Sequence, residues 1–199
     1  AIGAVELLRF SAEGSAPSRV VLSAAVIGAL IGAVSLTGSI IAWAKLDGVL
    51  DKRFTFPGQQ YINLLVFLAA ALAGAYLFLG LDVRVIIAFF VLALLFGVMM
   101  TLPIGGADMP VVISLYNAFT GLAVAFEGFV MQNAAMIIAG TVVGSAGTLL
   151  TQLMAKAMNR SLANVLFSGC GSGAGSTSAA VGAQGGAKAV STADAYLIL

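Results

Sequence analysis

The amino-acid sequence predicts an all-α, polytopic transmembrane helix bundle. Three observations predict it: 61% of the residues are hydrophobic, only 9% are charged, and the apolar residues form long continuous runs. A membrane-spanning helix needs about 20 consecutive apolar residues, whereas the strands of a membrane β-barrel alternate polar and apolar residues. Continuous runs rich in Ala, Leu and Gly therefore favour helices over strands.

Five runs are long enough to cross the hydrocarbon core of a bilayer. They cover residues 20–44, 61–80, 85–102, 110–131 and 134–156. Residues 1–10 are expected to be the tail of a truncated N-terminal helix, followed by a loop over 14–18. Residues 1–167 together are expected to form the transmembrane domain.

The basic residues near the helix ends indicate an orientation. One set of ends carries Lys45, Lys52, Arg53, Lys156 and Arg160, and the opposite set carries Arg9, Arg19 and Arg84. Cytoplasmic loops of membrane proteins carry an excess of Lys and Arg. We therefore expect the 45–59 loop, the 103–109 loop and the segment after the last span on the cytoplasmic side or its equivalent.

Composition also excludes several classes of partner. The net charge of +1 provides no basic patch for nucleic acid, so the expected partner surface is the lipid bilayer. The sequence has no His and a single cysteine, Cys170, which exclude the usual zinc and haem ligand sets and an intrachain disulfide. We expect no metal site.

The composition changes after the last span. Residues 168–190 are rich in Gly, Ser and Ala, which is typical of a flexible linker. Residues 191–199 begin with Ser191 and continue through Asp194, a pattern that fits a helix N-terminus. This segment is expected to be the start of a further domain.

Small and polar residues recur at helical spacing on three of the five spans. The first span carries Gly28, Gly32, Ser35 and Ser39, the fourth carries Ser114, Asn117, Gly121 and Gly128, and the fifth carries Gly140, Gly144, Gly147 and Thr151 beside Thr141, Ser145, Thr148 and Gln152. Close helix packing alone explains any one of these residues. We expect these three spans to face one another and the second and third spans to face lipid.

Three polar residues leave alternatives open. The amide of Asn117 fits either helix packing or a hydrated pathway. For Glu127 a solvated charge at the rim is favoured over a proton-binding site. Asp108 precedes Pro110 and is expected to cap the fourth span.

Several segments resemble one known family. Residues 105–112 read Gly-Gly-Ala-Asp-Met-Pro-Val-Val and are followed by Asn117, while 144–147, 156–161, 36–39 and 45–46 provide further matches in order. Over about residues 20–167 the chain resembles the membrane domain of the β subunit of proton-translocating nicotinamide nucleotide transhydrogenase. The resemblance implies that protons cross this domain while hydride passes between NAD(H) and NADP(H) in soluble domains.

The resemblance also implies roles for individual residues. Ser39 and Asn117 match channel-lining residues, and with Ser145 and Thr148 they form the expected proton path. Asp108, Gly147 and Arg160 match positions implicated in coupling and gating. No catalytic or cofactor-binding residue is expected in this fragment, because the NADP(H)-binding domain would follow the linker.

The resemblance further implies partners and a location. The α subunit and the NADP(H)-binding domain of the same enzyme are the expected partners, in a homodimer of the assembly. The expected location is the bacterial inner membrane or the mitochondrial inner membrane. Many members of the family carry a His in a β-subunit helix as the presumed proton relay, and its position would fall just before Ala1.

Two other functional classes remain open on the residues alone. An autonomous secondary transporter would carry its substrate site near the bilayer midplane and would show inverted repeats, which we do not find. A structural membrane scaffold would use every polar stripe for packing and would tolerate Ala at the hydroxyl positions.

Overall fold

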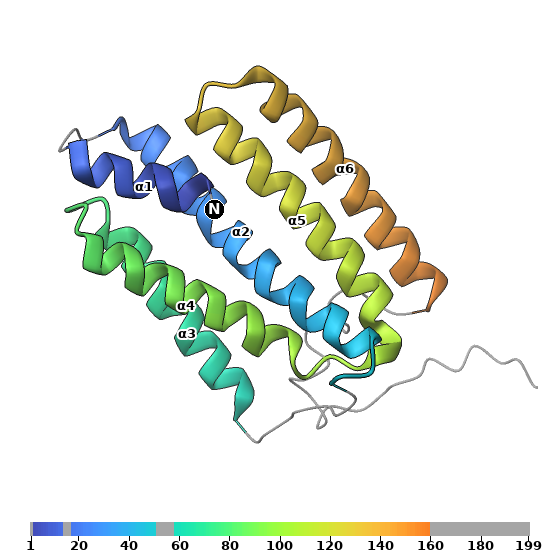
Figure 1. Ribbon diagram of the computed structural model, residues 1–199. Coiled ribbons are helices and arrows are strands. Elements are labelled where there is room, and N and C mark those ends of the chain that lie inside the picture. The colour runs from blue at the N-terminus through green and yellow to red at the C-terminus, as the bar shows by residue number, and fades with distance from the viewer. Residues whose placement is uncertain (1, 14–16, 51–57, 160–199) are drawn as a thin grey trace, which may run out of the picture.

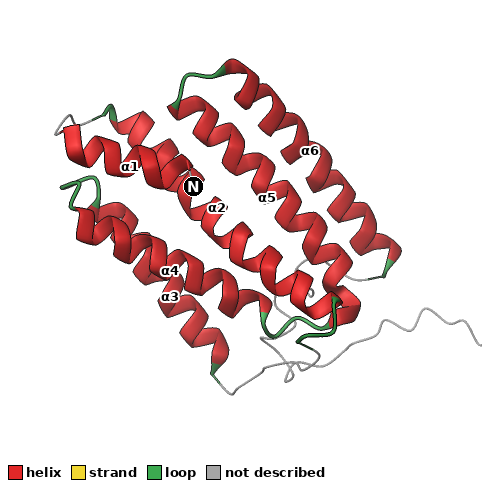
Figure 2. Ribbon diagram, in the orientation of Figure 1, coloured by secondary structure: helices red, strands yellow, loops and turns green. Residues whose placement is uncertain are grey.

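The computed structural model describes residues 2–13, 17–50 and 58–159, apart from the side chain of residue 107. Within these ranges the elements of regular secondary structure are all helices, joined by turns and short loops, and there are no strands. The helices are α1 (Ile2–Glu13), α2 (Arg19–Leu46), α3 (Gln59–Tyr76), α4 (Val83–Thr101), the short 3₁₀ helix η1 (Gly106–Asp108), α5 (Met109–Val130) and α6 (Ala134–Ala157). Figure 2 shows this all-α architecture, which confirms the predicted fold class. The expected linker and further domain lie outside the described residues.

The helices α2 to α6 are each long and apolar enough to cross a membrane. They correspond to the five predicted spans, and most of their ends lie within two residues of the predicted ones. The largest difference is at the end of α3, which stops at Tyr76 because the chain tightens into a turn. There the N–H groups of Phe78 and Leu79 bond to the carbonyls three residues before them, at 3.1 and 2.9 Å.

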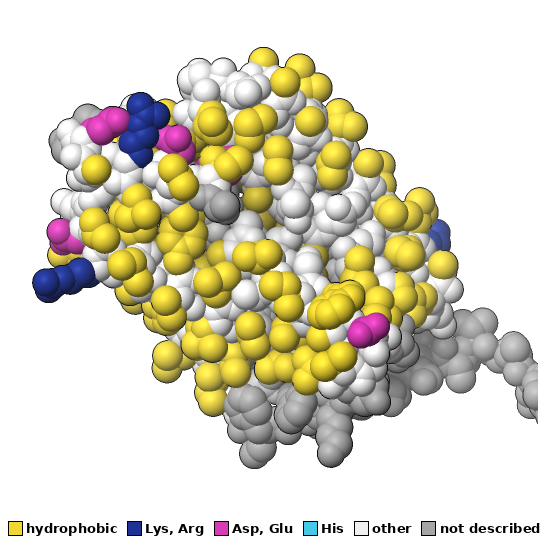
Figure 3. Space-filling view, in the orientation of Figure 1, with side chains coloured by type: hydrophobic (Ala, Val, Ile, Leu, Met, Phe, Trp, Pro, Cys, Tyr) yellow, Lys and Arg dark blue, Asp and Glu magenta, His cyan; other side chains and the backbone are white. Residues whose placement is uncertain are grey.

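The long helices form a row in the order α3, α4, α2, α5, α6 (Figure 1). The contacts of α6 are chiefly with α5, and those of α3 are chiefly with α4. The short helix α1 packs against α2 and α4. Figure 3 shows hydrophobic side chains over much of the visible face, as expected for a surface in contact with lipid.

The expectation that the second and third spans both face lipid is wrong for the third. That span is α4, which packs against α2 and buries Phe89 and Ala93 completely. Gly97 of α4 lies so close to α2 that an added Cβ would stand 2.7 Å from the carbonyl oxygen of Val34. The close approach at Gly97 makes α4 an internal helix of the row.

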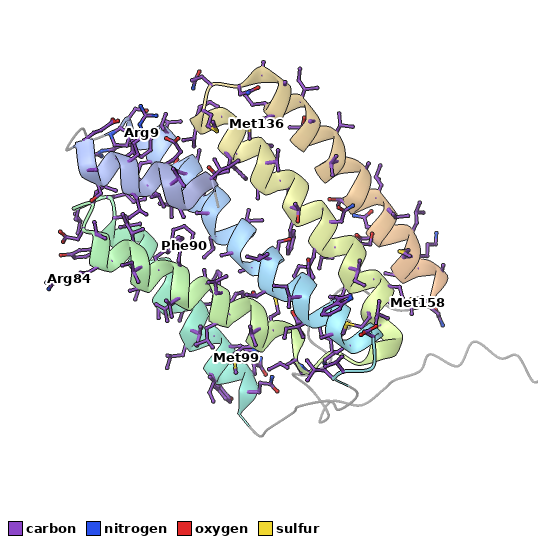
Figure 4. All side chains as sticks on the ribbon, viewed as in Figure 1. Arg9, Arg84, Phe90, Met99, Met136 and Met158 are labelled. Atoms are coloured by element: carbon purple, nitrogen blue, oxygen red, sulfur yellow. The ribbon has the colours of Figure 1, made fainter. Side chains whose placement is uncertain are left out.

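The two ends of the bundle are distinguished in Figure 4, which places Arg9, Arg84 and Met136 at one end and Met99 and Met158 at the other. We refer to them as the Arg84 end and the Met158 end. The Met158 end is the one predicted to face the cytoplasm, and that orientation stays a prediction.

The contact between α5 and α6 is made largely by backbone atoms. A Cβ added to Gly121 would lie 2.5 Å from the amide nitrogen of Gly144, and one added to Gly147 would lie 2.9 Å from the Cα of Ala118. The hydroxyl of Thr151 donates to Ser114 at 3.0 Å across the same contact. The predicted small face on the last span is therefore the surface that packs against α5.

Candidate functional site

A pair of hydroxyl groups joins α2 and α5 at mid-length. The Ser35 Oγ lies 2.6 Å from the Thr120 Oγ1, and both hydroxyls lie within hydrogen-bonding distance of the Tyr116 carbonyl oxygen, at 2.8 and 2.9 Å. Two hydroxyl protons thus serve three contacts. One hydroxyl donates to the Tyr116 carbonyl oxygen, and the other donates either to the first hydroxyl or to the same carbonyl. The two side chains can therefore exchange these roles by rotating their O–H bonds, with no movement of the backbone.

A cavity of about 420 Å³ lies on the Met158 side of this hydroxyl pair. It is lined by Ser39, Pro110, Ile113, Ser114, Asn117, Thr120, Leu150 and Met154. Ser39 and Asn117 are exposed in the chain, and neither side chain makes a hydrogen bond to a described residue. Their polar atoms are therefore available to water or to another helix.

A second cavity, of about 530 Å³, continues toward the Arg84 end. It shares Ser39 and Thr120 with the first, so the two adjoin along the contact between α2 and α5. Small residues of α1, α2 and α5 line much of it, and Phe90 and Leu94 of α4 form another wall. Figure 4 labels Phe90 on α4. We call the two adjoining spaces the α2–α5 groove.

Glu127 lies in the wall of the α2–α5 groove nearest the Arg84 end. Only 6% of its surface is exposed, so the favoured interpretation of a solvated charge at the rim is wrong. Burial results from α1, whose residue Gly3 packs directly over the carboxyl group. The signal in the sequence was spacing: Tyr116, Thr120 and Glu127 fall four and seven residues apart, which places them on one face of a helix.

The sequence prediction also missed Thr120. Its hydroxyl completes the pair with Ser35, but the stripe chosen on the fourth span ran through Ser114 and Gly121 instead. Those two residues face α6, whereas Thr120 faces α2. Two faces of α5 are therefore polar, and the groove is lined by Thr120, by Asn117 and by Ser114 from the face toward α6.

At the Met158 end, Asp108 is 3% exposed and ends the 3₁₀ helix η1. Asp108 occupies the N-cap position of α5, as expected, but its side chain makes no capping hydrogen bond and its backbone is already helical, with φ −92° and ψ −3°. Pro110 does occupy the first turn of α5, as predicted. The carboxyl group of Asp108 is therefore buried at the junction of η1 and α5.

Lys45 fixes the neighbouring segment between α4 and η1. Its ammonium group is buried and donates to the carbonyl oxygens of Thr101, Leu102 and Ile104, the first at 3.3 Å and the last at 2.7 Å. Thr101 and Leu102 stand at the end of α4, where the last carbonyls have no partner within the helix, and Ile104 lies just beyond it. The Thr101 carbonyl also accepts the Ile104 N–H, at 3.2 Å. One cation from α2 therefore holds the end of α4 in place beside Asp108.

Tyr116 connects the same region to the hydroxyl pair. Its phenol oxygen lies 2.6 Å from the Thr101 Oγ1, which is also 2.8 Å from the Gly97 carbonyl oxygen. The ring fills space that only a glycine at position 38 leaves open. Because the Tyr116 carbonyl binds Ser35 and Thr120, one residue contacts both the polar pair and the end of α4.

Comparison with known proteins shows the family of the chain. Residues 1–199 match the family model described as NAD(P) transhydrogenase beta subunit. The chain belongs to this family. Two curated relatives named NAD(P) transhydrogenase subunit beta, both from Rhodospirillum rubrum and one from a specified strain, are each 41% identical over 146 residues. The match covers 73% of this chain and 32% of each relative, so the chain spans about a third of their length.

The family and the five apolar helices fit a multi-pass membrane protein of the transhydrogenase beta-subunit family. Of the predicted path residues in this transhydrogenase beta-subunit chain, Ser39 and Asn117 line one cavity. Ser145 and Thr148 do not line it. They are exposed on α6 and donate to carbonyls of their own helix, at 3.0 Å to Val142 and 2.7 Å to Gly144.

The three predicted coupling residues are also dispersed. Asp108 is buried at the Met158 end, and Gly147 is buried against Ala118 of α5. Arg160 lies outside the described residues. Asp108 belongs to the segment between α4 and α5, whose beginning is contacted by Lys45 and Tyr116. Gly147 lies in the packing contact between α5 and α6.

Proposed function

We propose that this chain is the proton-conducting membrane part of an enzyme that couples hydride transfer between NAD(H) and NADP(H) to proton translocation. The observation that carries the proposal is the α2–α5 groove, whose two cavities adjoin at Ser39 and Thr120. Membership of the transhydrogenase beta-subunit family supports it. Polar side chains that line a space inside a membrane bundle are costly unless they pair or contact water.

The groove has the chemistry of a water-filled proton wire. Ser39 and Asn117 offer donors and acceptors that no described residue occupies, so each can orient a water molecule. Each of the Ser35 and Thr120 hydroxyls can accept a proton on one side while it releases its own on the other, and rotation of the O–H bonds then resets the pair. A conducting path along Asn117, Ser39, Thr120 and Ser35 would cross the middle of α5.

Coupling would act at the Met158 end. An NADP(H)-binding domain that docks there meets the segment between α4 and α5, which contains Asp108 and is held by Lys45. Movement of this segment reaches the hydroxyl pair through Tyr116, whose two ends contact Thr101 and Ser35. Ligand-dependent docking would then favour one of two states of the groove. Gly147 and Arg160 are proposed to support this coupling at the last helix and its exit.

The partners follow from the same proposal. Ser39 and Asn117 are exposed in the chain, so we place helices of the α subunit against the open side of the groove. The exposed flank of α6 with Ser145 and Thr148 would meet further helices of a homodimeric assembly. NAD(H) and NADP(H) bind in soluble domains, and the assembly resides in a bacterial or mitochondrial inner membrane.

Replacing Asn117 by leucine tests the proposal. In the complete enzyme reconstituted into liposomes, N117L is expected to lower the initial rate of proton transport driven by transhydrogenation at least tenfold. Leucine fills the same volume but can neither donate nor accept a hydrogen bond. Proton uptake is followed with an entrapped pH-sensitive dye, and hydride transfer is followed by the absorbance of the reduced nucleotide.

Q152L is the matched control, because it removes an amide from an exposed position on α6 outside the groove. It should leave the transport rate within about twofold. S145A and T148A, measured alongside, test whether these hydroxyls belong to the path as the sequence predicted. Full proton transport in folded N117L would refute the path, and transport without nucleotides would favour an autonomous transporter.

A further inference from the structure

The α2–α5 groove ends at a buried acid. Glu127 is the single ionisable side chain among the residues that line its two cavities. It is 94% buried, and its Oε2 atom has no hydrogen-bond partner among the described residues. A buried polar atom without a partner calls for an explanation, because leaving it unpaired destabilises the fold.

Two glycines make room for the Glu127 carboxyl group. A Cβ added to Gly28 of α2 would lie 3.1 Å from Oε1, and one added to Gly3 of α1 would lie closer still. Any larger residue at either position would displace the carboxyl group. Three helices thus contribute to one cradle that fits an acidic side chain and opens onto the groove.

No cation in the described part of the chain neutralises this acid. The salt bridge there joins Arg9 and Glu13, at the exposed end of α1. The charged residues of α2 and α4 lie in the first and last turns of those helices, and α1 adds Glu6, which is itself acidic. Within an apolar bundle the neutral carboxyl is tolerated, whereas the anion requires a compensating positive charge or water.

We propose that Glu127 is the proton-binding site of the groove. It would accept a proton at the Arg84 end and release it toward the Ser35 and Thr120 hydroxyls. Thr120 and Glu127 lie two helical turns apart on one face of α5, which is about 10 Å and leaves space for a short chain of water molecules. The hydroxyls and the amide transmit protons without storing one, and Glu127 adds the storage site in a chain without histidine.

This inference rests on the proposed proton path. Two measurements distinguish a failure of the inference from a failure of the path. The first is labelling of the complete enzyme in liposomes with dicyclohexylcarbodiimide, an apolar reagent for protonated carboxyl groups. The acid proton moves to a reagent nitrogen while the carboxylate oxygen bonds to the central carbon, and the adduct rearranges to a stable N-acylurea. Mass spectrometry of the peptides should find the adduct on Glu127 and not on Glu13.

The second measurement is proton transport by E127Q, E127D and the matched control E13Q. Glutamine keeps the size of the side chain but cannot release a proton, so E127Q should lower transport at least tenfold. E127D keeps the acid and should retain more transport than E127Q. E13Q removes a carboxyl group at the exposed end of α1 and should stay within about twofold of the parent enzyme.

Each outcome decides the matter. Labelling of Glu127 together with loss of transport in E127Q supports the inference. Absence of the adduct, or full transport by E127Q in an enzyme that N117L inactivates, overturns it while the proposed path stands. Full transport by both E127Q and N117L overturns the path and the inference together.

Discussion

Replacing Gly140 by valine is expected to separate α5 from α6 and to lower the stability of the bundle markedly. A Cβ at position 140 would stand 2.7 Å from the Gly121 carbonyl oxygen and closer still to the amide nitrogen of Ala125. Both atoms belong to the backbone of α5, so no side chain can move aside. Overpacking of this kind costs about 1 to 3 kcal/mol, and more where the helices cannot shift.

The measurement is the free energy of unfolding in mixed micelles titrated with a denaturing detergent. G80A is the control, because nothing lies within 4 Å of a Cβ added at position 80. It should change the unfolding free energy by less than about 0.5 kcal/mol. If G140V unfolded with the same free energy as the parent, the close backbone contact would be wrong.

Replacing Lys45 by methionine is expected to destabilise the Met158 end by about 2 to 5 kcal/mol. Methionine has nearly the same length, but it leaves the buried carbonyls of Thr101, Leu102 and Ile104 without their cationic donor. Each unsatisfied buried carbonyl costs about 1 to 3 kcal/mol. Local opening should be visible as faster hydrogen exchange at the end of α4, compared with the middle of the same helix.

K156M is the matched control, since Lys156 is exposed in the last turn of α6. Its exchange rates at the end of α4 should equal those of the parent chain. K45R should restore part of the protection, because guanidinium donors reach the same carbonyls. Equal exchange in K45M and K156M would mean that the Lys45 contacts do not hold this segment.

Much of the fold could be predicted because one property, the length of a continuous apolar run, largely identifies a membrane-spanning helix. Runs of apolar residues long enough to cross the bilayer identified all five spans, and most ends agreed closely. The end of α3 did not, since the apolar residues continue through the turn after Tyr76. Hydropathy also gave no information on which helix is internal, so α4 with its buried Phe89 was placed in lipid.

The candidate site was harder to predict, because it depends on how helices rotate against each other. Ser39 and Asn117 were predicted together and line one cavity, since both continue small or polar stripes. Ser145 and Thr148 also continue a stripe, yet they lie beside the packing face of α6. A polar stripe identifies a helix face, and only the packing of neighbours decides what that face contacts.

The burial of Glu127 could not be predicted from the sequence of α5 alone. A carboxyl group near the end of a span reaches the headgroup region when nothing covers it, which made the rim the simplest assignment. The structure buries it because Gly3 and Gly28 come from two other helices. Spacing within α5 places Glu127 on the same helix face as Thr120, but it could not reveal a cradle that also needs α1 and α2.

The glycine contacts between α5 and α6 determine which movements the bundle can make. With backbone against backbone at Gly121 and Gly144, neither helix can slide or turn without collision. The contact between α2 and α5 is different, since hydroxyl groups and a groove with free volume lie along it. We therefore expect α5 and α6 to move as one rigid unit that hinges against α2, so that any change in the width of the groove is accompanied by a larger displacement of the exposed face of α6, which lies farther from the hinge.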